Sequence, residues 1–311
     1  MKKKYLIYFI FISLIILLFF GCPEQGTSSS GNDRSNSSSS TPVIYTAGCD
    51  SSHYPCYWTG TTKTLLGPGG QVYSIYVYNG TVYTAGYDSS HHACYWTGTT
   101  KTILDTSGGT ALSIYVYNGT VYTAGYDSSH YPCYWTGTTK TTLDSSIGEA
   151  ISIYVYRHGI VYTAGFDSSG QACYWVGTTK TTLDSSGGTA LSIYVYKGTV
   201  YTAGYDSSHY PCYWTGTAKT TLDSSGVARS IYVYNGAVYT AGHDSFNHPC
   251  YWTSGTIETT LASSGTAISI YVYKGTVYTA GYDSYSSCYW AGTTKTALDS
   301  SGGQAGSIYV Y

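Results

Sequence analysis

The chain has 311 residues, enough to bury a large hydrophobic core. Only 10% of its residues are charged, against about 25% in an average soluble protein, and the formal net charge is −2. Phosphate binding needs clustered Lys and Arg, so this composition argues against a nucleic-acid partner. With 39 tyrosines in the chain, tyrosine hydroxyls, Ser and Thr must keep its surface hydrated.

The N-terminus predicts an exported protein. Lys2–Lys4 precede the apolar run Tyr5–Phe20, and Gly21-Cys22 follows, which is the pattern of an export signal. The end of this segment is similar to a bacterial lipoprotein signal, in which a small residue precedes the cysteine that becomes lipidated. The two Phe residues before Gly21 bring it closer to the relaxed motif of spirochaete-like lipoproteins. The alternative is an uncleaved anchor, but this run is short for a hydrocarbon core of about 30 Å.

The chain divides into three parts on this interpretation. Residues 1–21 form the signal peptide, and residues 22–42 carry the lipidated Cys22 and a flexible tether, because a Ser-rich segment without apolar periodicity cannot bury surface. The tether spans roughly 25 Å. We therefore expect residues 43–311 to be exported and held by lipid at a bacterial membrane, in the periplasm or at the cell surface.

Residues 43–311 consist of seven near-identical repeats. Their Cys-Tyr-Trp segments recur every 38 to 40 residues, at Trp58, Trp96, Trp135, Trp175, Trp214, Trp252 and Trp290. A fixed period of this length is typical of a repeat architecture, in which one unit cannot bury its apolar surface alone.

One repeat contains four candidate strands. Residues 113–117 are β-branched and aromatic, and Asn118-Gly119, a strong hairpin signal, separates them from a second strand at 120–126. A third strand follows at 133–136, and a short outer strand at 140–143. Four short antiparallel strands per unit, repeated seven times, predict the blades of a β-propeller.

The two ends of the repeat region complete each other. The segment at 43–46 is a second strand without a first, and the segment at 307–311 is a first strand without a second. We therefore predict an all-β fold, a seven-bladed β-propeller of four-stranded antiparallel blades, closed by pairing of the N- and C-terminal strands, which removes exposed edges. A β-solenoid or an open sandwich is the alternative. A solenoid rung, however, is nearer about 20 residues, and a sandwich needs no identical units.

One cysteine recurs in every blade, at Cys56, Cys94, Cys133, Cys173, Cys212, Cys250 and Cys288. Sheets pack about 10 Å apart, whereas a disulfide needs Cα atoms within about 7 Å. We therefore interpret these cysteines as small buried hydrophobes. Cys49, which replaces a tyrosine, faces Cys56 across a tight turn, so a Cys49–Cys56 disulfide is an open alternative in an exported protein.

Histidines and aspartates recur in the turn after the second strand. A histidine lies three residues before the cysteine in four blades, but one blade offers at most a pair of ligands where structural zinc needs four, so we expect no metal and no cofactor. An aspartate follows every second strand, at Asp50, Asp88, Asp127, Asp167, Asp206, Asp244 and Asp283. Seven such carboxylates could form a ring that binds a ligand. The favoured interpretation is an Asx-turn, in which each carboxylate accepts a neighbouring backbone N–H.

No catalytic constellation emerges from the repeats. An active site needs residues in unequal roles at one place, whereas near-identical blades supply equal residues at seven places. We therefore expect a binding protein and not an enzyme. The sixth blade departs most from the consensus, at His243, Phe246, Asn247, His248 and Glu258.

The turns after the second and fourth strands of a blade emerge on one side, which we take as the binding side. The candidate binding residues on it are Asp127, His130, Tyr131, Asp206, His209, Tyr210, His53 and Tyr54. Tyrosine combines a large contact area with a polar tip, so this side suits shallow recognition of a protein or glycan by a monomer. The alternatives are a structural scaffold in envelope assembly and a propeller hydrolase or lyase.

The repeats as a whole resemble a group of bacterial proteins. Tyr83-Thr84-Ala85-Gly86 and Cys94-Tyr95-Trp96 carry the pattern VY-x-AG followed by CYW, which every blade repeats. This pattern resembles the repeats of bacterial propeller-type lipoproteins, many of them uncharacterised and some from spirochaetes. The resemblance implies an envelope lipoprotein and no defined activity. The WD40 and kelch signatures are absent from the sequence, so the functions of those families do not transfer.

Lipidation at Cys22 is directly testable. Cells fed labelled fatty acid should incorporate the label into this chain, and the substitution Cys22→Ala should abolish incorporation, because the thiol is the site of attachment. Gel fluorography of the purified chain measures the label. Equal labelling of the Cys22→Ala chain would contradict the lipoprotein interpretation.

Overall fold

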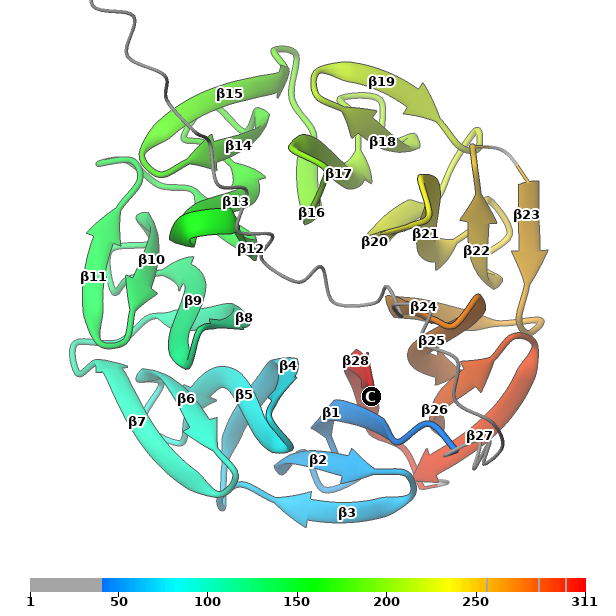
Figure 1. The fold of residues 1–311 in the computed structure, drawn as a ribbon, viewed down its shortest axis with the longest axis horizontal. Coiled ribbons are helices and arrows are strands. Elements are labelled where there is room, and N and C mark those ends of the chain that lie inside the picture. Colours follow the sequence, from blue (N-terminus) through cyan, green and yellow to red (C-terminus); the bar gives the residue numbers. More distant parts are fainter. Residues whose placement is uncertain (1–40, 256, 285, 300) are drawn as a thin grey trace, which may run out of the picture. The chain divides into compact units, whose positions relative to one another are not determined.

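The computed structural model describes residues 41–311 except 256, 285 and 300. The predicted signal peptide, Cys22 and almost all of the tether lie outside the described residues. Residues 42–311 form seven four-stranded antiparallel sheets arranged in a ring (Figure 1). The predicted seven-bladed β-propeller is therefore confirmed. Within the described range, no helix is long and apolar enough to cross a bilayer.

Every blade uses its four strands in the same order from the centre of the ring outward. The first strands are β28 (Gln304–Val310), β4 (Gly70–Tyr78), β8 (Thr110–Tyr117), β12 (Glu149–Tyr156), β16 (Thr189–Tyr196), β20 (Val227–Tyr234) and β24 (Gly265–Tyr273). The second strands are β1 (Ile44–Cys49), β5 (Thr81–Asp88), β9 (Thr120–Tyr126), β13 (Ile160–Phe166), β17 (Thr199–Tyr205), β21 (Ala237–His243) and β25 (Thr276–Asp283).

The outer two strands of each blade are shorter. The third strands are β2 (Pro55–Thr59), β6 (Ala93–Thr97), β10 (Pro132–Thr136), β14 (Ala172–Val176), β18 (Pro211–Thr215), β22 (Pro249–Thr253) and β26 (Ser286–Ala291). The fourth strands are β3 (Thr62–Leu65), β7 (Thr100–Asp105), β11 (Thr139–Thr142), β15 (Thr179–Asp184), β19 (Ala218–Thr221), β23 (Ile257–Thr260) and β27 (Thr294–Asp299). One 3-10 turn, η1 (Arg157–Gly159), replaces the two-residue hairpin of blade four, where the sequence is one residue longer.

Blade one is assembled from both ends of the chain, as predicted. β28 pairs antiparallel with β1, with Ile308 opposite Thr46. Val43 and Tyr311 extend this pairing by exchanging two backbone hydrogen bonds of 2.8 and 3.0 Å. The sheet order β28-β1-β2-β3 therefore closes the ring with an ordinary four-stranded blade.

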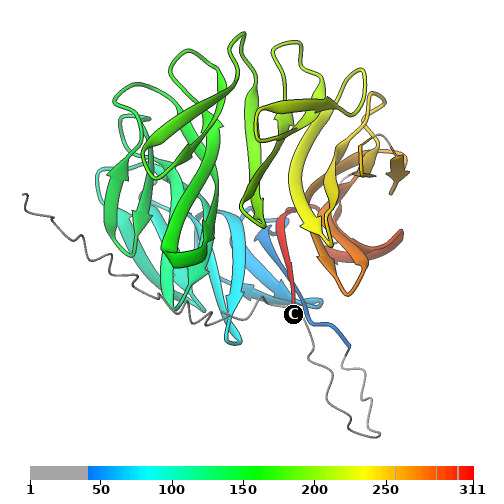
Figure 2. The ribbon, with the colours of Figure 1, turned by 45° about the horizontal axis from the view of Figure 1, so that its top comes forward.

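Successive connections alternate between the two sides of the ring (Figure 2). The turns between second and third strands and the linkers between blades lie on one side, which we call the loop face. The tight turns between first and second strands and between third and fourth strands lie on the other side, the hairpin face. Because β1 begins and β28 ends at the hairpin face, the described chain enters and leaves the propeller there.

The core lies between neighbouring sheets. The seven Cys-Tyr-Trp tryptophans are at most 1% exposed, and the seven blade cysteines are fully buried. All of these thiols, and that of Cys49, are free, and burial raises the pKa of Cys94 to about 12. The strand register sets Cys49 opposite Pro55 and Cys56 opposite Gly48. Side chains alternate between the faces of a sheet, so Cys49 and Cys56 point to opposite sides, and the pairing left open from sequence is not formed.

A glycine in each second strand forces the inner strand out of regular pairing. A Cβ atom on Gly125 would lie 1.8 Å from the carbonyl oxygen of Thr110, so only glycine fits this approach. At the same level β8 carries a bulge, since Ala111 and Ser113 are paired with consecutive residues of β9 and Leu112 is left without a partner. A bulge at this position recurs in all seven blades. Because pairing continues on the other side of the bulge, at Thr110 and Ala111, β8 starts three residues before the strand predicted from sequence.

A ring of serines joins each blade to the next. Ser113 Oγ accepts the backbone N–H of Ile153 on the neighbouring inner strand at 3.2 Å. Ser74, Ser152, Ser192, Ser230, Ser269 and Ser307 make the equivalent bond at 3.1–3.2 Å. The inner strands are sheet edges, and an edge N–H without a partner is unfavourable when it is shielded from water. The serine ring satisfies one such N–H per blade.

A ring of tyrosines follows two residues later on the inner strands. Tyr76, Tyr115, Tyr154, Tyr194, Tyr232, Tyr271 and Tyr309 form a closed circle in which neighbouring ring centroids lie 4.7–5.1 Å apart. Burial raises the pKa of Tyr76 to about 12, so the hydroxyls stay protonated. Each tilted aromatic pair contributes about 0.5–1.5 kcal/mol beyond area burial.

Removing residues 307–311 should destabilise the whole propeller. The deletion takes away most of β28, one member of the serine ring and one of the tyrosine ring, and it exposes the edge of β1. Burial of a single large apolar side chain is worth about 1.5–3 kcal/mol, so the loss approaches the net stability of a typical domain. Thermal unfolding followed by circular dichroism should show a melting temperature far below that of the parent, or aggregation. A truncated chain that melts like the parent would contradict ring closure.

Candidate functional site

Six of the seven predicted turn aspartates accept backbone N–H groups of the turn that follows their strand, and for Asp283 the structure describes the contact with Lys295. Asp127 Oδ1 accepts the backbone N–H groups of Ser129 and Tyr131 at 3.0 and 3.1 Å. Its Oδ2 accepts Lys140 Nζ at 2.9 Å, and the carboxylate is nearly buried. Asp206 is bound in the same way by Ser208, Tyr210 and Lys219. These contacts are those of the Asx-turn interpretation, and they occupy both carboxylate oxygens.

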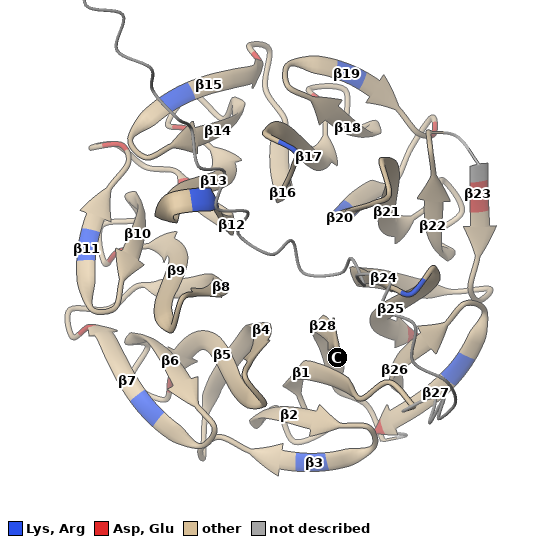
Figure 3. Cartoon of the chain, in the orientation of Figure 1, with Lys and Arg blue, Asp and Glu red and all other residues tan. Residues whose placement is uncertain are grey.

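The lysines of the outer strands hold these carboxylates in six blades. The Nζ–Oδ2 distances are 2.6–2.9 Å for Lys63, Lys101, Lys140, Lys180, Lys219 and Lys295. Figure 3 shows the basic segments spaced around the rim, with an acidic one on β23. Burial alone would raise the pKa of Asp127, but hydrogen bonds from Lys140 and two backbone N–H groups hold it below its ordinary value.

Blade six replaces the lysine by Glu258, and its turn adapts. His248 Nδ1 contacts Asp244 Oδ2 at 3.0 Å in the place of the missing ammonium group. Phe246 stacks on His248 with a centroid distance of 5.7 Å and remains 76% exposed. Burial and the carboxylates of Asp244 and Asp223 raise the pKa of Glu258. The deviation that the sequence showed in this blade therefore rearranges one turn and exposes one large aromatic ring.

The turn histidines have a conformational role. His130 adopts φ 57° and His209 adopts φ 60°, the left-handed region that blade four fills with Gly170. Their rings stack on the tyrosines that end the second strands, His130 on Tyr126 at 4.8 Å and His209 on Tyr205 at 5.2 Å. Among the described residues, no group of three or more His, Cys, Asp or Glu is arranged to hold a metal ion.

The predicted binding residues do not converge on one pocket. His53 and Tyr54 belong to blade one, Asp127, His130 and Tyr131 to blade three, and Asp206, His209 and Tyr210 to blade five. His53, His130 and His209 are exposed, and Tyr131 is half-buried. Tyr54 and Tyr210 are 42% and 44% exposed, respectively. Together they form separated aromatic and polar tips around the loop face.

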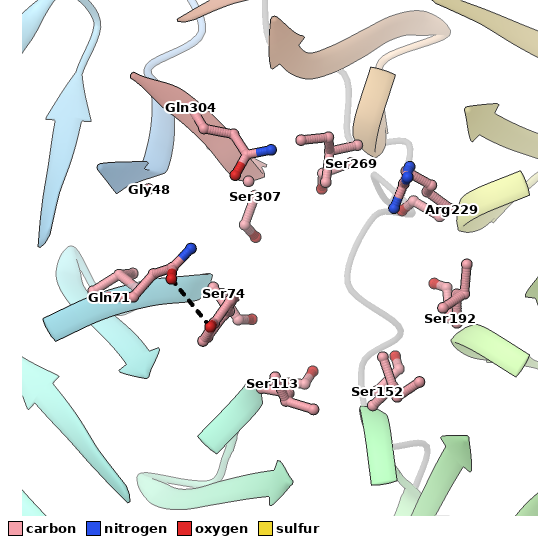
Figure 4. A pocket seen from close by; sticks show the side chains of 18 of the residues that line it. Gly48, Gln71, Ser74, Ser113, Ser152, Ser192, Arg229, Ser269, Gln304 and Ser307 are labelled. Atoms are coloured by element: carbon pink, nitrogen blue, oxygen red, sulfur yellow. Dashed lines mark hydrogen bonds between the residues drawn. The ribbon is translucent and has the colours of Figure 1, made fainter. Parts of the chain in front are cut away.

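A cavity of about 370 Å³ lies at the centre of the ring, lined by the inner strands and by Gly48 and Cys49 at the end of β1 (Figure 4). The seven serines of the ring line it, together with Gln71 and Gln304 near the start of their strands. Inner strands begin at the loop face, and the cavity lining ends at the serines, two residues before the tyrosine ring. The cavity is therefore in the loop-face half of the channel, with the tyrosines beyond it.

The bulge residues supply the part of this lining that differs between blades. All seven of these residues line the cavity, namely Tyr73, Leu112, Ile151, Leu191, Arg229, Ile268 and Gly306. Sequence reasoning missed this ring. The sequence does contain a signal for it. The residue directly before each Ser-Ile-Tyr segment varies from blade to blade, whereas the residues around it repeat, and in one blade this residue is charged.

Arg229 has an uncompensated charge. It is the one basic residue on the seven inner strands. Its Nε is buried and has no hydrogen-bond partner, and no described carboxylate forms an ion pair with it. Burial lowers its pKa, and the neighbouring His243 also has a buried, unpartnered Nδ1. Glu149, the one acidic residue on the inner strands, has a pKa raised by burial.

Comparison with known proteins identifies the fold and no activity. No protein-family model and no curated protein match the chain. Among solved structures, 252 chains match, so the fold is widely shared. One of them is the extracellular domain of a protein from B. thetaiotaomicron assigned as a hybrid two-component system. It has a TM-score of 0.51 and 9% identity, and the match covers 78% of this chain and 37% of that one. The propeller thus resembles a bacterial extracellular domain, of which this chain spans little more than a third.

The pairs between buried aspartates and half-exposed lysines predict acid sensitivity. Asp50, Asp88, Asp127, Asp167 and Asp206 all have pKa values lowered in the folded state. Their stabilisation is therefore complete above the unfolded-state pKa of about 3.9 and is lost as pH falls through the lower folded values. The melting temperature should be nearly level from about pH 7 to 4 and fall steeply towards pH 2.

The variant Asp127→Asn is the matched control for this pH dependence. The asparagine can keep the Asx-turn but not the charge, so its melting curve should depend less on pH than that of the parent. The half-exposed lysines limit the effect of one pair to about 0.2–1 kcal/mol. A parent protein equally stable at pH 7 and pH 2 would show that these carboxylates do not matter for stability.

Proposed function

We propose that this protein is a lipid-anchored component of a bacterial envelope whose propeller binds a protein or glycan partner through its loop face. The observation that carries the proposal is the contrast between the two faces. The loop face presents the exposed rings of Tyr54, Tyr210 and Phe246 around a central cavity. The hairpin face consists mainly of two-residue turns that offer little surface, apart from the three-residue turn η1 and the exposed ring of Tyr311.

Exposed aromatics favour recognition on the loop face. Tyr54, Tyr210 and Phe246 project from turns whose backbones are fixed by a buried aspartate. A rigid turn reduces the entropy lost on binding, and a tyrosine or phenylalanine ring provides contact area with few rotatable bonds. Because the aspartates are engaged internally, the partner would meet aromatic rings, histidines and serines, a combination that suits polypeptide or sugar surfaces.

The distribution of charge supports the orientation that an anchor would impose. All described aspartates lie at or beside loop-face connections, whereas Arg157, Lys197 and Lys274 occupy hairpin-face turns, each over a tyrosine ring at 5.0–5.4 Å. Anionic lipid headgroups attract basic residues. The chain also enters the propeller at the hairpin face, so a tether from Cys22 would attach there and leave the loop face accessible.

The chain itself supplies the variants that test this proposal. Blade four has Gly170-Gln171 where blades three and five have His-Tyr. Replacing His130 and His209 by Gly, and Tyr131 and Tyr210 by Gln, therefore removes four candidate side chains while keeping a turn that the protein already uses. Capture of a partner from envelope extract, or binding on a glycan array, should fall by at least about tenfold, with the melting temperature nearly unchanged.

The control changes the opposite face in the same manner. Blades five and seven have Lys-Gly hairpins, so Asn118→Lys and Asn235→Lys transplant an existing turn onto the hairpin face. This variant should capture partners as the parent does. If the hairpin-face variant lost partner capture and the loop-face variant kept it, the partner would bind the hairpin face, and the proposal would be wrong.

A further inference from the structure

The bulge ring makes the central cavity chemically asymmetric within an otherwise repetitive ring. Six blades supply uncharged bulge residues, and Arg229 is the exception. Figure 4 shows its guanidinium among the cavity-lining side chains. Arg229 is partly buried, and its Nε is shielded from water without a hydrogen-bond partner. Such an arrangement is unfavourable, and replacing the residue by an apolar one is often stabilising. Blades three and five have leucine at this position, so the fold itself does not require a cation there.

The rest of the polar lining consists mainly of hydrogen-bond donors. Each serine of the ring accepts an N–H from the next blade, which leaves its own O–H free to donate. The side-chain oxygen of Gln71 accepts the hydroxyls of Tyr73 and Tyr87 at 3.2 and 3.4 Å, which leaves its NH₂ group available. Donors around a guanidinium match a ligand that carries acceptors and a negative charge.

Apolar side chains cover the remaining wall of the cavity. Leu191 and Ile268 flank Arg229 on the two adjacent blades, and Leu112 and Ile151 continue the wall beyond Leu191. Gly306 contributes no side chain and leaves space. A volume of about 370 Å³ is within the range of small-molecule pockets.

We propose that this cavity binds a small organic carboxylate with an aliphatic body. The carboxylate contacts Arg229 and the serine hydroxyls, and the body packs against Leu112, Ile151, Leu191 and Ile268. The proposal deepens the proposed function, on which it rests in taking the loop face as the binding face, and it names a ligand class for the centre of that face.

The test uses the full chain in detergent and cyclohexanecarboxylate as the probe. Calorimetric titration should give a Kd of about 1 mM or tighter. Cyclohexanecarboxamide, which has the same shape without the charge, should bind at least about tenfold more weakly, as should inorganic phosphate, which lacks the apolar body. No binding of cyclohexanecarboxylate, or equal binding of the carboxamide or of phosphate, would overturn the proposal.

Two substitutions at Arg229 separate a binding role from a structural one. Arg229→Gln should weaken cyclohexanecarboxylate binding by about 10- to 100-fold, and Lys197→Gln on the hairpin face, the matched loss of one cation, should leave it unchanged. Arg229→Leu installs the residue of blades three and five, and it should raise the melting temperature while abolishing binding. Unchanged binding in Arg229→Gln, or a lower melting temperature in Arg229→Leu, would contradict the proposal.

The outcomes also keep this inference apart from the proposed function. The loop-turn variant changes the rim at His130, Tyr131, His209 and Tyr210, so it should lose partner capture and retain cyclohexanecarboxylate binding. Arg229→Gln should lose the carboxylate in the same assay conditions. If no partner is captured but cyclohexanecarboxylate binds and depends on Arg229, only the macromolecular partner is refuted. If a partner is captured but cyclohexanecarboxylate does not bind, only the cavity ligand is refuted.

Discussion

The close approach of the second strand to the inner strand determines most of what is distinctive in this propeller. Gly125 and its six equivalents lie so near a carbonyl oxygen that a methyl group would overlap it. The bulge that accompanies this approach turns one residue out of the ladder and into the channel, and it sets the following serine in reach of the next blade. A single steric requirement thus positions the inter-blade hydrogen bond and the variable lining of the cavity.

Neighbouring blades are held together by contacts between their inner strands as well as by the buried tryptophans between the sheets. The serine hydrogen bonds and the tyrosine circle both run through every inner strand and close at Ser307 and Tyr309. The serine hydrogen bonds satisfy backbone N–H groups at the strand edges that water would otherwise have to reach through the channel, and the tyrosines add ring contacts between blades. The rim is built differently, from aspartates that each fix one turn locally. Packing is therefore shared around the ring. Each loop-face turn is held mainly by the aspartate of its own blade, with added contacts to the linker from the preceding blade, such as the Ser207 N–H to Asp184 and the Ser245 N–H to Asp223.

The fold could be predicted from the sequence because repetition multiplies weak signals. Six short hairpins that contain glycine and seven Cys-Tyr-Trp strands, with complementary ends at Val43 and Tyr311, leave few architectures. The predicted strand limits agree with the structure within three residues. The turn chemistry of Asp127 was also readable, because an aspartate followed by serines favours an Asx-turn. The cavity was not predictable. Arg229 lies in a strand in which alternation of side chains is expected, and the bulge turns it into the channel. The variable position before Ser-Ile-Tyr marks this residue in the sequence, but strand register, which sets the direction of its side chain, does not follow from the sequence pattern.

Closure by the last strand affects how the chain is made. Ile75 is bound to Ser307 across a separation of 232 residues, and β1, among the first strands synthesised, pairs with β28, the last. At about 5–20 residues per second, the ribosome needs on the order of 15–60 s between these two events. During that interval the edge of β1 is a template for pairing with other chains, including other copies of the same repeat. Because the blades are nearly identical, this open edge meets several strands of almost the same sequence with which it can pair in the wrong register until β28 is made.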